Sequence, residues 1–589
     1  MADSQNGFCI FHEESDLKDA SSFRERIQQK LDKGDYDFSG YCFPNQTGFQ
    51  STTFSGKVSF AESSFAGNVS FCEASFTDDV SFVDARFAGD LSFEKAQFQG
   101  ARADFTRAKF GMPGSSLFSG FQTKFDDAVF AGNEARFDEA VFAGSAATFC
   151  GTVFECPYVS FRQVSFEVRD RLFFLKTVFA ASECTDFTGA RFLAAHTCFE
   201  DAHFQGVLTT FWGAQFKGEE LSFYSARFAA KSAYFNEVLF SSNQTKFRCA
   251  EFSGDKTIFS ESKFVSGIID LSLTDFHASE TFFHNAIFSA ESVDFKECRF
   301  RGQYTGFAGA SFSCEVKFDE ASFSGERTVF ANADFSRGYV SFDGSRFSAT
   351  DTDFGWYGIH CRKSSGGHVV FHAATFLPGR VSFCGRDLDG WRFPGARWDR
   401  ADFSSTIWPS RGHRAAICTD EVLARKPQKS VKGERRNQFR IAEGVCRNIK
   451  QSLQMTGNYK EAGEFYYGEM ECARLSQDIF TRERFRLLFF KLLCGYGERP
   501  LWVLFVGLAT VIVFALMHMW RTIIETGTSN LTHDFLTCLY FSGVTFTTLG
   551  FGDFCPTGTL GRIFSVSEAS LGAVLLALFT VSISRKFSR

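Results

Sequence analysis

The chain has 589 residues, which excludes a single compact core and predicts several domains. Its formal net charge at pH 7 is -6, with acidic and basic residues interspersed, so charge alone argues neither for a nucleic-acid partner nor against one. Phe occurs 80 times against 7 Trp and 6 Met, an excess that predicts a repeat with Phe at a fixed position.

Residues 1–45 are expected to form an N-terminal cap region. They contain Asp3, Glu13, Glu14 and Asp16 and no apolar stretch, so they do not read as a secretory signal. We therefore expect the N-terminal part of the chain in the cytoplasm. The 18 Cys show no CxxC pair and no zinc-type spacing, which favours free thiols in a reducing compartment.

Phe recurs at regular intervals across residues 46–408. The spacing is five then six residues, as in Phe60, Phe65 and Phe71, and from Phe125 onward it is five then seven. An Ala usually stands two residues before the second Phe of each pair, as at Ala74, Ala85, Ala96, Ala128, Ala140, Ala202, Ala214, Ala226, Ala310 and Ala321. This period fits neither an amphipathic helix nor simple strand alternation. It predicts a solenoid in which each face contributes one inward Phe.

The array resembles pentapeptide-repeat proteins, whose unit is a small residue, any residue, Leu or Phe, and two polar residues. The resemblance implies a right-handed, four-sided β-helix. One or two residues are inserted here after every second pentapeptide, and we expect them to bulge at one corner without breaking the stack. If two units make one coil, the region has about fifteen coils and is about 70 Å long.

The repeat decays near Trp391, Trp398 and Trp408, which are expected to cap the last coil. We interpret the repeated Phe as a packed core and not as a stacking platform for bases or ligands. Because Lys and Arg are mixed with Asp and Glu, we expect neither a DNA-like acidic surface nor a nucleic-acid partner.

Residues 409–498 are predicted to form a basic linker and a helical hairpin. The basic residues are Arg425, Lys426, Lys429, Lys432, Arg435 and Arg436. They form either a solvated linker or a contact with anionic lipid headgroups. Apolar residues at helical spacing then occupy 441–453 and 459–473, with Gly457-Asn458 between them. Residues 457–474 resemble part of a tetratricopeptide-type helix pair, which is either a coupling element or a plain spacer.

Residues 499–589 contain two apolar segments long enough to cross a membrane, at 501–520 and at about 563–583. The second has one ionisable residue, Glu568, which we expect to face the back of the loop between the spans. Basic residues flank the two spans on the side of the chain termini, namely Arg482, Arg484, Arg486, Lys491, Arg499, Arg585, Lys586 and Arg589. This bias predicts a multi-pass protein of the inner (plasma) membrane with both termini in the cytoplasm.

Between the spans, residues 534–546 form an amphipathic stretch too short to cross a membrane. It is followed by Thr547-Thr548-Leu549-Gly550-Phe551-Gly552-Asp553. This segment resembles the potassium-channel pore loop, whose signature is Thr-Val-Gly-Tyr-Gly-Asp and in which a half-length helix precedes an extended return. If successive carbonyls are to face one axis, alternate residues must reach the left-handed region, and Gly does so without strain.

The resemblance implies that the backbone carbonyls of Thr548, Leu549, Gly550 and Phe551 coordinate K+, that the Thr548 hydroxyl closes the inner site, and that Gly552 completes the filter. Thr547, Asp553 and Tyr540 would support the filter, with Tyr540 bonding Asp553 because Phe551 lacks the usual tyrosine hydroxyl. Val544 stands where some members of the family carry a buried carboxylate. Gly572, midway along the second span, is either a gating hinge or a point of close helix packing.

These features predict a passive, potassium-selective channel that is a homotetramer, because one chain supplies one filter strand and an ion cage needs four. The membrane lipid and the permeant K+ are its expected partners, and no cofactor is expected. The alternatives are a less selective cation pore and a membrane-tethered interaction scaffold with a weak or silent pore. The β-helix would be a regulatory or scaffold domain, with a protein partner left open. We expect no enzyme, since no arrangement of His, Asp and Ser or Cys stands out.

Overall fold

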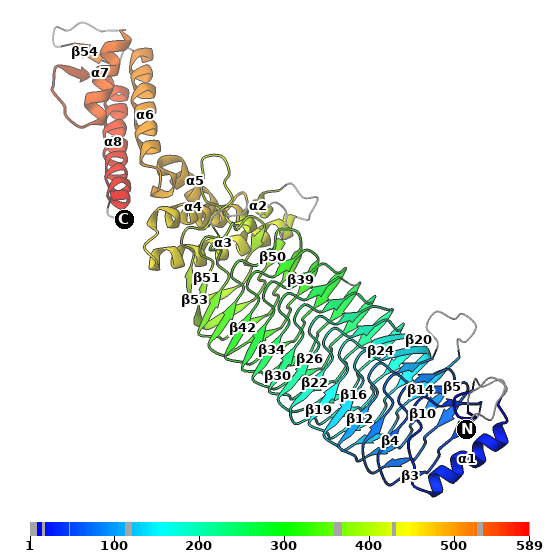
Figure 1. Cartoon of the computed structure of the whole chain (residues 1–589). Helices are drawn as coiled ribbons and strands as arrows, with labels where there is room; N and C mark the ends of the chain where they lie inside the picture. The colour runs from blue at the N-terminus through cyan, green and yellow to red at the C-terminus, as the bar shows by residue number, and fades with distance from the viewer. Residues whose placement is uncertain are drawn as a thin grey trace. The chain divides into compact units, whose positions relative to one another are not determined.

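The structure is a computed structural model that describes residues 9–13, 18–45, 47–111, 120–265, 267–358, 368–426, 432–521, 524–526 and 534–587. The chain divides into two compact units, Met1–Thr406 and Ile407–Arg589. The first is a β-solenoid and the second is helical (Figure 1).

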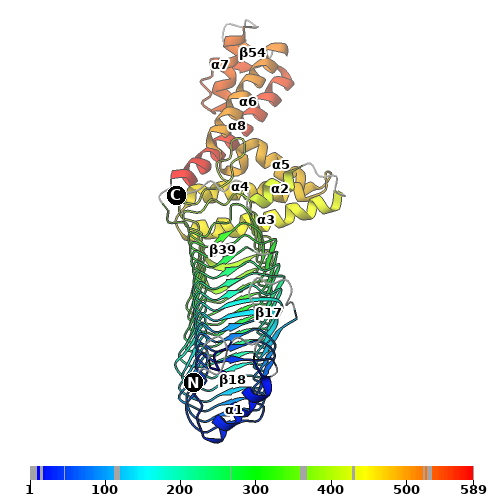
Figure 2. The same ribbon diagram turned by 45° about the vertical axis from the view of Figure 1, so that its right-hand side comes forward.

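The solenoid has about 14 turns, close to the number expected. Most of its strands have two or three residues, from β1 (Cys42–Phe43) to β53 (Arg397–Asp402). Each typical strand pairs in parallel with the strand four places later, so that β25 (His203–Phe204) lies in register with β29 (Arg227–Phe228). Four strands therefore make one turn, which confirms both the four-sided coil and the two repeat units per coil (Figure 2).

Phe side chains fill the interior of the solenoid as continuous stacks. In one stack Phe187, Phe211, Phe235 and Phe259 follow one another with ring centroids 4.8, 5.0 and 4.6 Å apart and nearly parallel planes. Rings of neighbouring stacks meet edge to face, as Phe199 does with Phe211 at 6.1 Å and 88°. All of these side chains are fully buried. The repeated Phe is thus a packed core, held by area burial and by favourable ring geometry.

The turns of the solenoid differ at alternate corners. After the first Phe of a pair the chain enters the left-handed region, as at Glu62 and Asp84, with φ of 58° and 57°. The inserted residues follow the second Phe of each pair. In one turn they precede the strands β24 (His196–Cys198) and β26 (Leu208–Thr210). These two strands pair with different strands of the next turn. The insertions therefore lie at two corners of each turn and not at one, because two units make a turn, and the parallel pairing continues past them as expected.

Side chains of α1 and of the last solenoid strands, β52 (Trp391–Arg392) and β53, close the two ends of the Phe core. At the N-terminal end, α1 (Ala20–Asp32) begins at the N-cap Asp19 and buries Phe23, whose ring meets that of Phe43 at 5.5 Å. At the other end Trp391 is buried against the ring of Phe371, and Trp398 meets Phe403 edge to face. Trp408 belongs to the second unit, where it packs on Phe465.

The second unit consists of helices joined by short connections. Their bounds are α2 (Thr419–Arg425), α3 (Lys432–Met455), α4 (Tyr459–Ser476), α5 (Arg482–Cys494), the 3-10 helix η2 (Gly495–Gly497), α6 (Pro500–Arg521), α7 (Phe535–Phe546) and α8 (Gly558–Phe587). A two-stranded antiparallel ribbon pairs β54 (Ile524–Thr526) with β55 (Phe554–Pro556).

The helical hairpin predicted from the sequence is formed by α3 and α4. Gly457 joins them with φ of 79°, and the Asn458 side chain caps α4 by accepting from the Glu461 amide. Within the basic stretch, Arg425 pairs with Glu421 and Arg436 pairs with Asp478, so these two charges serve the helical unit itself. Residues 427–431 lie outside the described residues.

Candidate pore site

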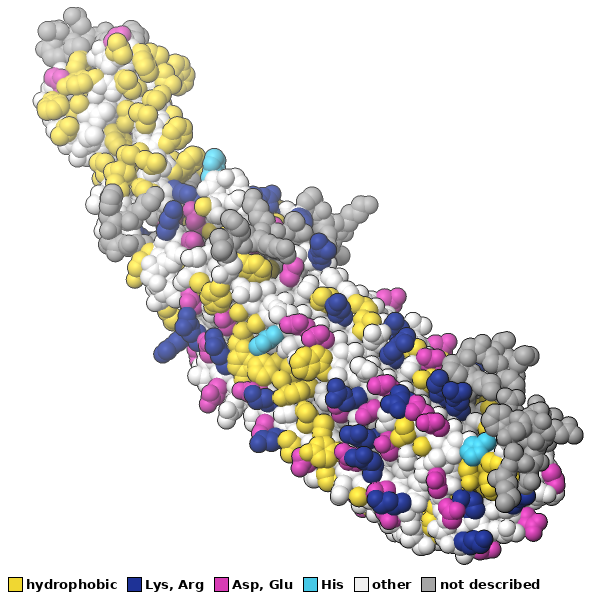
Figure 3. Space-filling model, in the orientation of Figure 1, with side chains coloured by type: hydrophobic (Ala, Val, Ile, Leu, Met, Phe, Trp, Pro, Cys, Tyr) yellow, Lys and Arg dark blue, Asp and Glu magenta, His cyan; other side chains and the backbone are white. Residues whose placement is uncertain are grey.

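Two helices, α6 and α8, are long and apolar enough to cross a membrane by length and composition. Many of their apolar side chains are uncovered within one chain, as at Leu501, Leu504, Phe505, Leu508, Val513, Leu516, Ile563, Val566, Val574 and Val581. Figure 3 shows hydrophobic side chains gathered over this part of the unit. A bilayer or neighbouring subunits would cover such a surface, which is larger than soluble monomers usually expose.

The short helix α7 lies between the two spanning helices. It begins at the N-cap Asp534, whose carboxylate accepts a hydrogen bond from the Thr537 amide at 3.1 Å. One side of α7 is buried through Cys538, Phe541 and Ser542, and the helix packs against both α6 and α8. The predicted half-length helix is therefore present.

The segment after α7 alternates between two backbone conformations. Thr548, Gly550 and Gly552 adopt left-handed φ values of 56°, 55° and 81°, whereas Leu549 and Phe551 between them do not. Gly takes this region without strain, but it is costly for a β-branched residue such as Thr548. Thr548 adopts it at the end of α7, where helices often stop on a left-handed residue. The Leu549 amide donates there to the Val544 carbonyl oxygen at 3.0 Å.

The side chains of this segment have little cover within one chain. Leu549 is 63% exposed and Phe551 is 66% exposed, which is unusual for large apolar groups. The Thr547 hydroxyl donates back to the Gly543 carbonyl oxygen at 2.8 Å. The Tyr540 hydroxyl interacts with the Asp553 carboxylate, and its ring packs on that of Phe554 at 5.8 Å.

A buried polar cluster lies behind the segment, between all three membrane helices. The Ser542 hydroxyl on α7 lies in hydrogen-bond contact with the Glu568 carboxyl on α8 and at 2.8 Å from the Val511 carbonyl oxygen on α6. His518 on α6 contacts the other Glu568 oxygen at 3.3 Å, and its ring packs edge to face on Phe541. Glu568 therefore faces the pore loop, as predicted. His518 was not predicted, although it is the ionisable residue inside the first span, where such groups seek a partner.

Replacing Glu568 with Leu is expected to lower the stability of the helical unit by about 2 kcal/mol. The change leaves the buried His518 without its carboxyl partner, and an unpaired buried polar group costs about 1–3 kcal/mol. Glu568→Gln keeps a hydrogen-bonding group at the same place and is expected to cost less. Thermal unfolding of both variants in detergent measures the difference, and equal melting temperatures for the two would contradict the role given to this cluster.

Gly572 is a point of close packing between α8 and the end of α7. A Cβ atom there would lie 2.2 Å from the Phe546 carbonyl oxygen and 3.0 Å from its carbonyl carbon. Only Gly allows the two backbones to approach this closely. Its role as a gating hinge stays a prediction.

Gly572→Ala is expected to destabilise the unit by about 1–3 kcal/mol, the usual range for overpacking a filled site. The matched control is Gly543→Ala on α7, where a Cβ has no neighbour within 4 Å and the change should be neutral or slightly stabilising. Melting temperatures of the two purified variants provide the comparison. An unchanged melting temperature for Gly572→Ala would mean that the contact relaxes at no cost.

The connection from the hairpin to the first spanning helix is made by ion pairs. Glu471 on α4 accepts from Lys491 on α5 at 2.9 Å and from the Tyr496 hydroxyl at 3.0 Å, and it also pairs with Arg474. Burial alone would raise the pKa of Glu471, but the hydrogen bonds from Arg474 and Lys491 outweigh it and lower the pKa to about 2. Arg499, which precedes α6, pairs with Glu464 at 2.9 Å. The hairpin and the start of the span are thus firmly joined.

The comparisons with known proteins bear on this region. The family model described as "Ion channel" matches residues 501–589, which contain α6, α7 and α8. Neither the curated proteins nor the solved structures compared with this chain match it. The C-terminal part of the chain is therefore an ion-channel domain of the two-transmembrane type, joined to a solenoid that resembles pentapeptide repeats.

Proposed function

We propose that the chain forms a passive, potassium-selective channel in which four copies surround one ion pathway. The observation that carries the proposal is the alternating backbone at Thr548, Gly550 and Gly552, placed directly after a half-length helix and before a spanning helix. Alternation of this kind lets successive carbonyls face one axis, where they can replace the hydration shell of a monovalent cation.

The proposal assigns the ion sites to the backbone carbonyls of Thr548, Leu549, Gly550 and Phe551, with Gly552 ending the filter. Four chains are required because one chain contributes a single filter strand. The uncovered side chains of Leu549 and Phe551 support this assembly, since neighbouring subunits would bury them. α7 ends at the filter, and the negative end of its dipole favours a cation there.

The filter supports in the proposal are Thr547, Asp553 and Tyr540. The interaction between Tyr540 on α7 and Asp553 links the half-length helix to the residue that follows the filter. In the orientation we propose, both termini and the solenoid are cytoplasmic and the loop opens to the outside of the plasma membrane, following the distribution of basic residues. The solenoid would then act as a regulatory or scaffold domain.

Flux through liposomes tests the proposal directly. Purified full-length protein is reconstituted, and the potassium and sodium fluxes down equal gradients are compared, with barium as the blocker. We expect a barium-sensitive flux that favours potassium, from protein whose mass in detergent is that of a tetramer. No flux from a folded tetramer would reject the channel and favour a membrane-tethered scaffold. Equal sodium and potassium fluxes would reject selectivity alone.

The amphipathic helix α5 is expected to lie at the membrane surface. Phe485, Phe489 and Leu492 share one side of this helix, at spacings of four and three, and all three are exposed within the chain. The helix also carries Arg482, Arg484 and Arg486 and ends six residues before α6 begins. An apolar face beside basic residues is typical of helices that bind the interface of anionic membranes.

A photo-crosslinking residue in place of Phe489 tests this position. Benzoylphenylalanine at residue 489 in vesicles with anionic lipid is expected to give lipid adducts, which mass spectrometry detects on the α5 peptide. The same group in place of the exposed Tyr459, at the start of α4, is the control and should give few adducts. Similar adduct yields at both positions would contradict an interfacial α5.

A further inference from the structure

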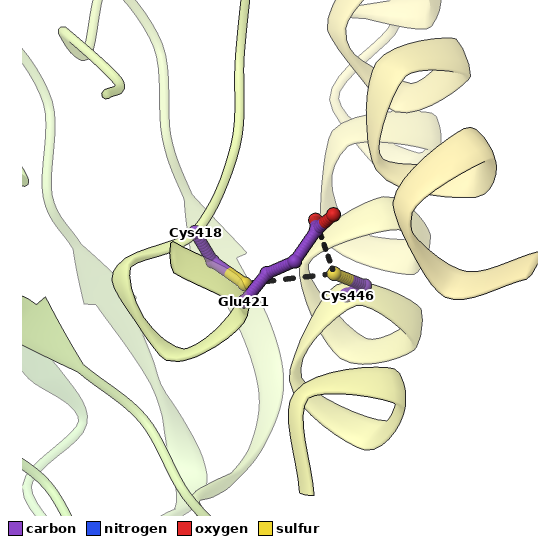
Figure 4. Close-up of side chains that lie close together, drawn as sticks. All are labelled: Cys418, Glu421 and Cys446. Atoms are coloured by element: carbon purple, nitrogen blue, oxygen red, sulfur yellow. Dashed lines mark hydrogen bonds between the residues drawn. The ribbon is translucent and has the colours of Figure 1, made fainter. Parts of the chain in front are cut away.

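A cluster of buried thiols and one carboxylate lies between α2, α3 and α4, outside the pore. The Sγ atoms of Cys418 and Cys446 are 3.5 Å apart, and the Cys446 thiol donates to the Glu421 carboxylate at 3.9 Å (Figure 4). The three ligand atoms all lie within 4.8 Å of one another, and all three residues are buried. The sequence did not predict this cluster, because its cysteines are far apart in the chain and have no zinc-type spacing.

Cys418 occupies a helix position that a thiol does not normally fill. It is the N-cap residue of α2, where Ser, Thr, Asp or Asn usually accepts a hydrogen bond from the helix amides. The Cys418 side chain makes no such capping bond and instead points toward Cys446. Capping therefore does not explain the residue at this position, whereas a ligand between the two thiols would.

Glu421 presents one carboxylate oxygen to the thiols while cations hold the other. Its Oε1 accepts from Arg414 at 2.5 Å and from Arg425 at 2.8 and 3.1 Å. Its Oε2 lies on the side of Cys446. The paired oxygen fixes the carboxylate in place, which is the arrangement that outer-shell partners provide for metal-ligating carboxylates.

A glycine on α4 leaves the space beside this cluster open. A Cβ at Gly468 would lie 2.8 Å from Glu421 Oε2, 2.6 Å from Arg414 Nη2 and 3.2 Å from Cys446 Sγ. Any side chain there would push into the cluster. A third thiol, Cys472, lies one helical turn farther along α4 and is fully buried in an apolar cluster with Ala424, Phe439 and Ala442.

We propose that Cys418, Glu421 and Cys446 supply three ligands of a structural site for a thiophilic divalent cation of the Zn²⁺ class. Zinc bonds to thiolate sulfur at about 2.3 Å in tetrahedral sites, which separates two ligating sulfurs by about 3.8 Å. The observed separation of 3.5 Å is within easy adjustment of that value. The site would tie the N-terminus of α2 to α3, the first helix of the hairpin.

The charges around the cluster suit such a centre. Two thiolates and one carboxylate carry three negative charges, so a divalent cation leaves a net charge of -1, beside the two guanidinium groups of Arg414 and Arg425. A thiol must lose its proton before its sulfur can ligate a metal. Binding therefore displaces the thiol protons to solvent, and affinity should rise with pH.

Zinc titration of the full-length protein tests the proposal. The reduced protein, freed of metal by dialysis against a chelator, is titrated against a chromophoric competitor, and bound zinc is counted by elemental analysis. We expect about one zinc per chain. The double variant Cys418→Ser with Cys446→Ser should bind at least about 100-fold more weakly, since two of the three protein ligands are lost. The control, Cys249→Ser with Cys384→Ser in the solenoid, should bind as the parent does.

A second measurement uses the unaltered chain, so that its result does not depend on how well a variant folds. Zinc is expected to protect Cys418 and Cys446 from alkylation in mild denaturant, read peptide by peptide, while Cys156 in the solenoid is alkylated equally with and without zinc. Absence of zinc uptake by the parent, uptake that persists in the double variant, or unchanged alkylation would overturn the site. A disulfide between Cys418 and Cys446 with no metal uptake after reduction would overturn it as well. None of these readouts depends on ion flux.

Discussion

Gly550→Asp is expected to abolish potassium flux, lowering it by more than about 100-fold. Gly550 has a left-handed φ of 55°, which costs a residue with a Cβ atom about 1–2 kcal/mol. In a tetramer the change also places four carboxylates around the ion pathway, where they compete with the carbonyls for the ion. A Cβ at residue 550 has no neighbour within 4 Å inside one chain, so the expected loss comes from the filter and not from a clash within the subunit.

Gly543→Ala is the control for this experiment, because residue 543 lies on α7 outside the filter and also has free space around a Cβ. Both variants are compared with the parent for assembly, by mass in detergent, and for barium-sensitive flux in liposomes. If the Gly550→Asp variant forms a tetramer with normal flux, residues 548–552 do not form the filter. Loss of assembly in Gly550→Asp alone would instead show that the filter strands hold the subunits together.

Phe211→Ala is expected to lower the stability of the solenoid by about 3–5 kcal/mol, the usual cost of truncating a buried Phe to Ala. Phe211 is fully buried, stacks on Phe187 and Phe235 at 4.8 and 5.0 Å, and meets neighbouring rings edge to face. The four-sided coil cannot collapse around one missing ring, because its corners are held in register by strands on both sides. The cavity should therefore remain and the full cost should appear.

The adjacent residue provides the control. Trp212 is 50% exposed, and its indole N–H donates to Glu237 at 3.2 Å. Trp212→Ala therefore removes a side chain larger than that of Phe211, but from the surface of the same solenoid turn. We expect a loss below about 1 kcal/mol. Urea unfolding followed by circular dichroism measures both. A similar loss for the two variants would mean that side-chain size and not burial sets the stability of the coil.

The arrangement of strands was predictable to the extent that it is periodic. The spacing of Phe60, Phe65 and Phe71 gives the faces of the coil, because a large side chain at a fixed interval must point the same way in each unit. That the inserted residues lie at two corners of each turn was not predicted. The number of corners with an insertion depends on how many repeat units make up one turn. That number is decided by which strands pair, and the paired strands are far apart in the sequence.

The pore region was predictable because its signals are local. The lengths of the two spans, the half-length helix and the Gly-x-Gly motif each depend on residues close in sequence, and the bilayer and backbone geometry constrain them strongly. Glu568 could be placed against the pore loop because a carboxyl inside a span needs a partner. Its partners Ser542 and His518 were not predicted. An ionisable group such as His518 inside a span signals that it needs a partner but not which residue that partner is, and the hydroxyl of Ser542 carries no such signal.

The amino-acid sequence by itself therefore determined the solenoid, its Phe core, the two spans and the motif at Thr548, Gly550 and Gly552. Each of these features depends on a repeat period or a backbone requirement that can be recognised from residues close together in the sequence. Only the tertiary structure decided the contact of Gly572 with the end of α7 and the meeting of Cys418, Glu421 and Cys446. Those contacts join segments that lie tens of residues apart, and their distances follow from how the helices pack, which no interval in the sequence encodes.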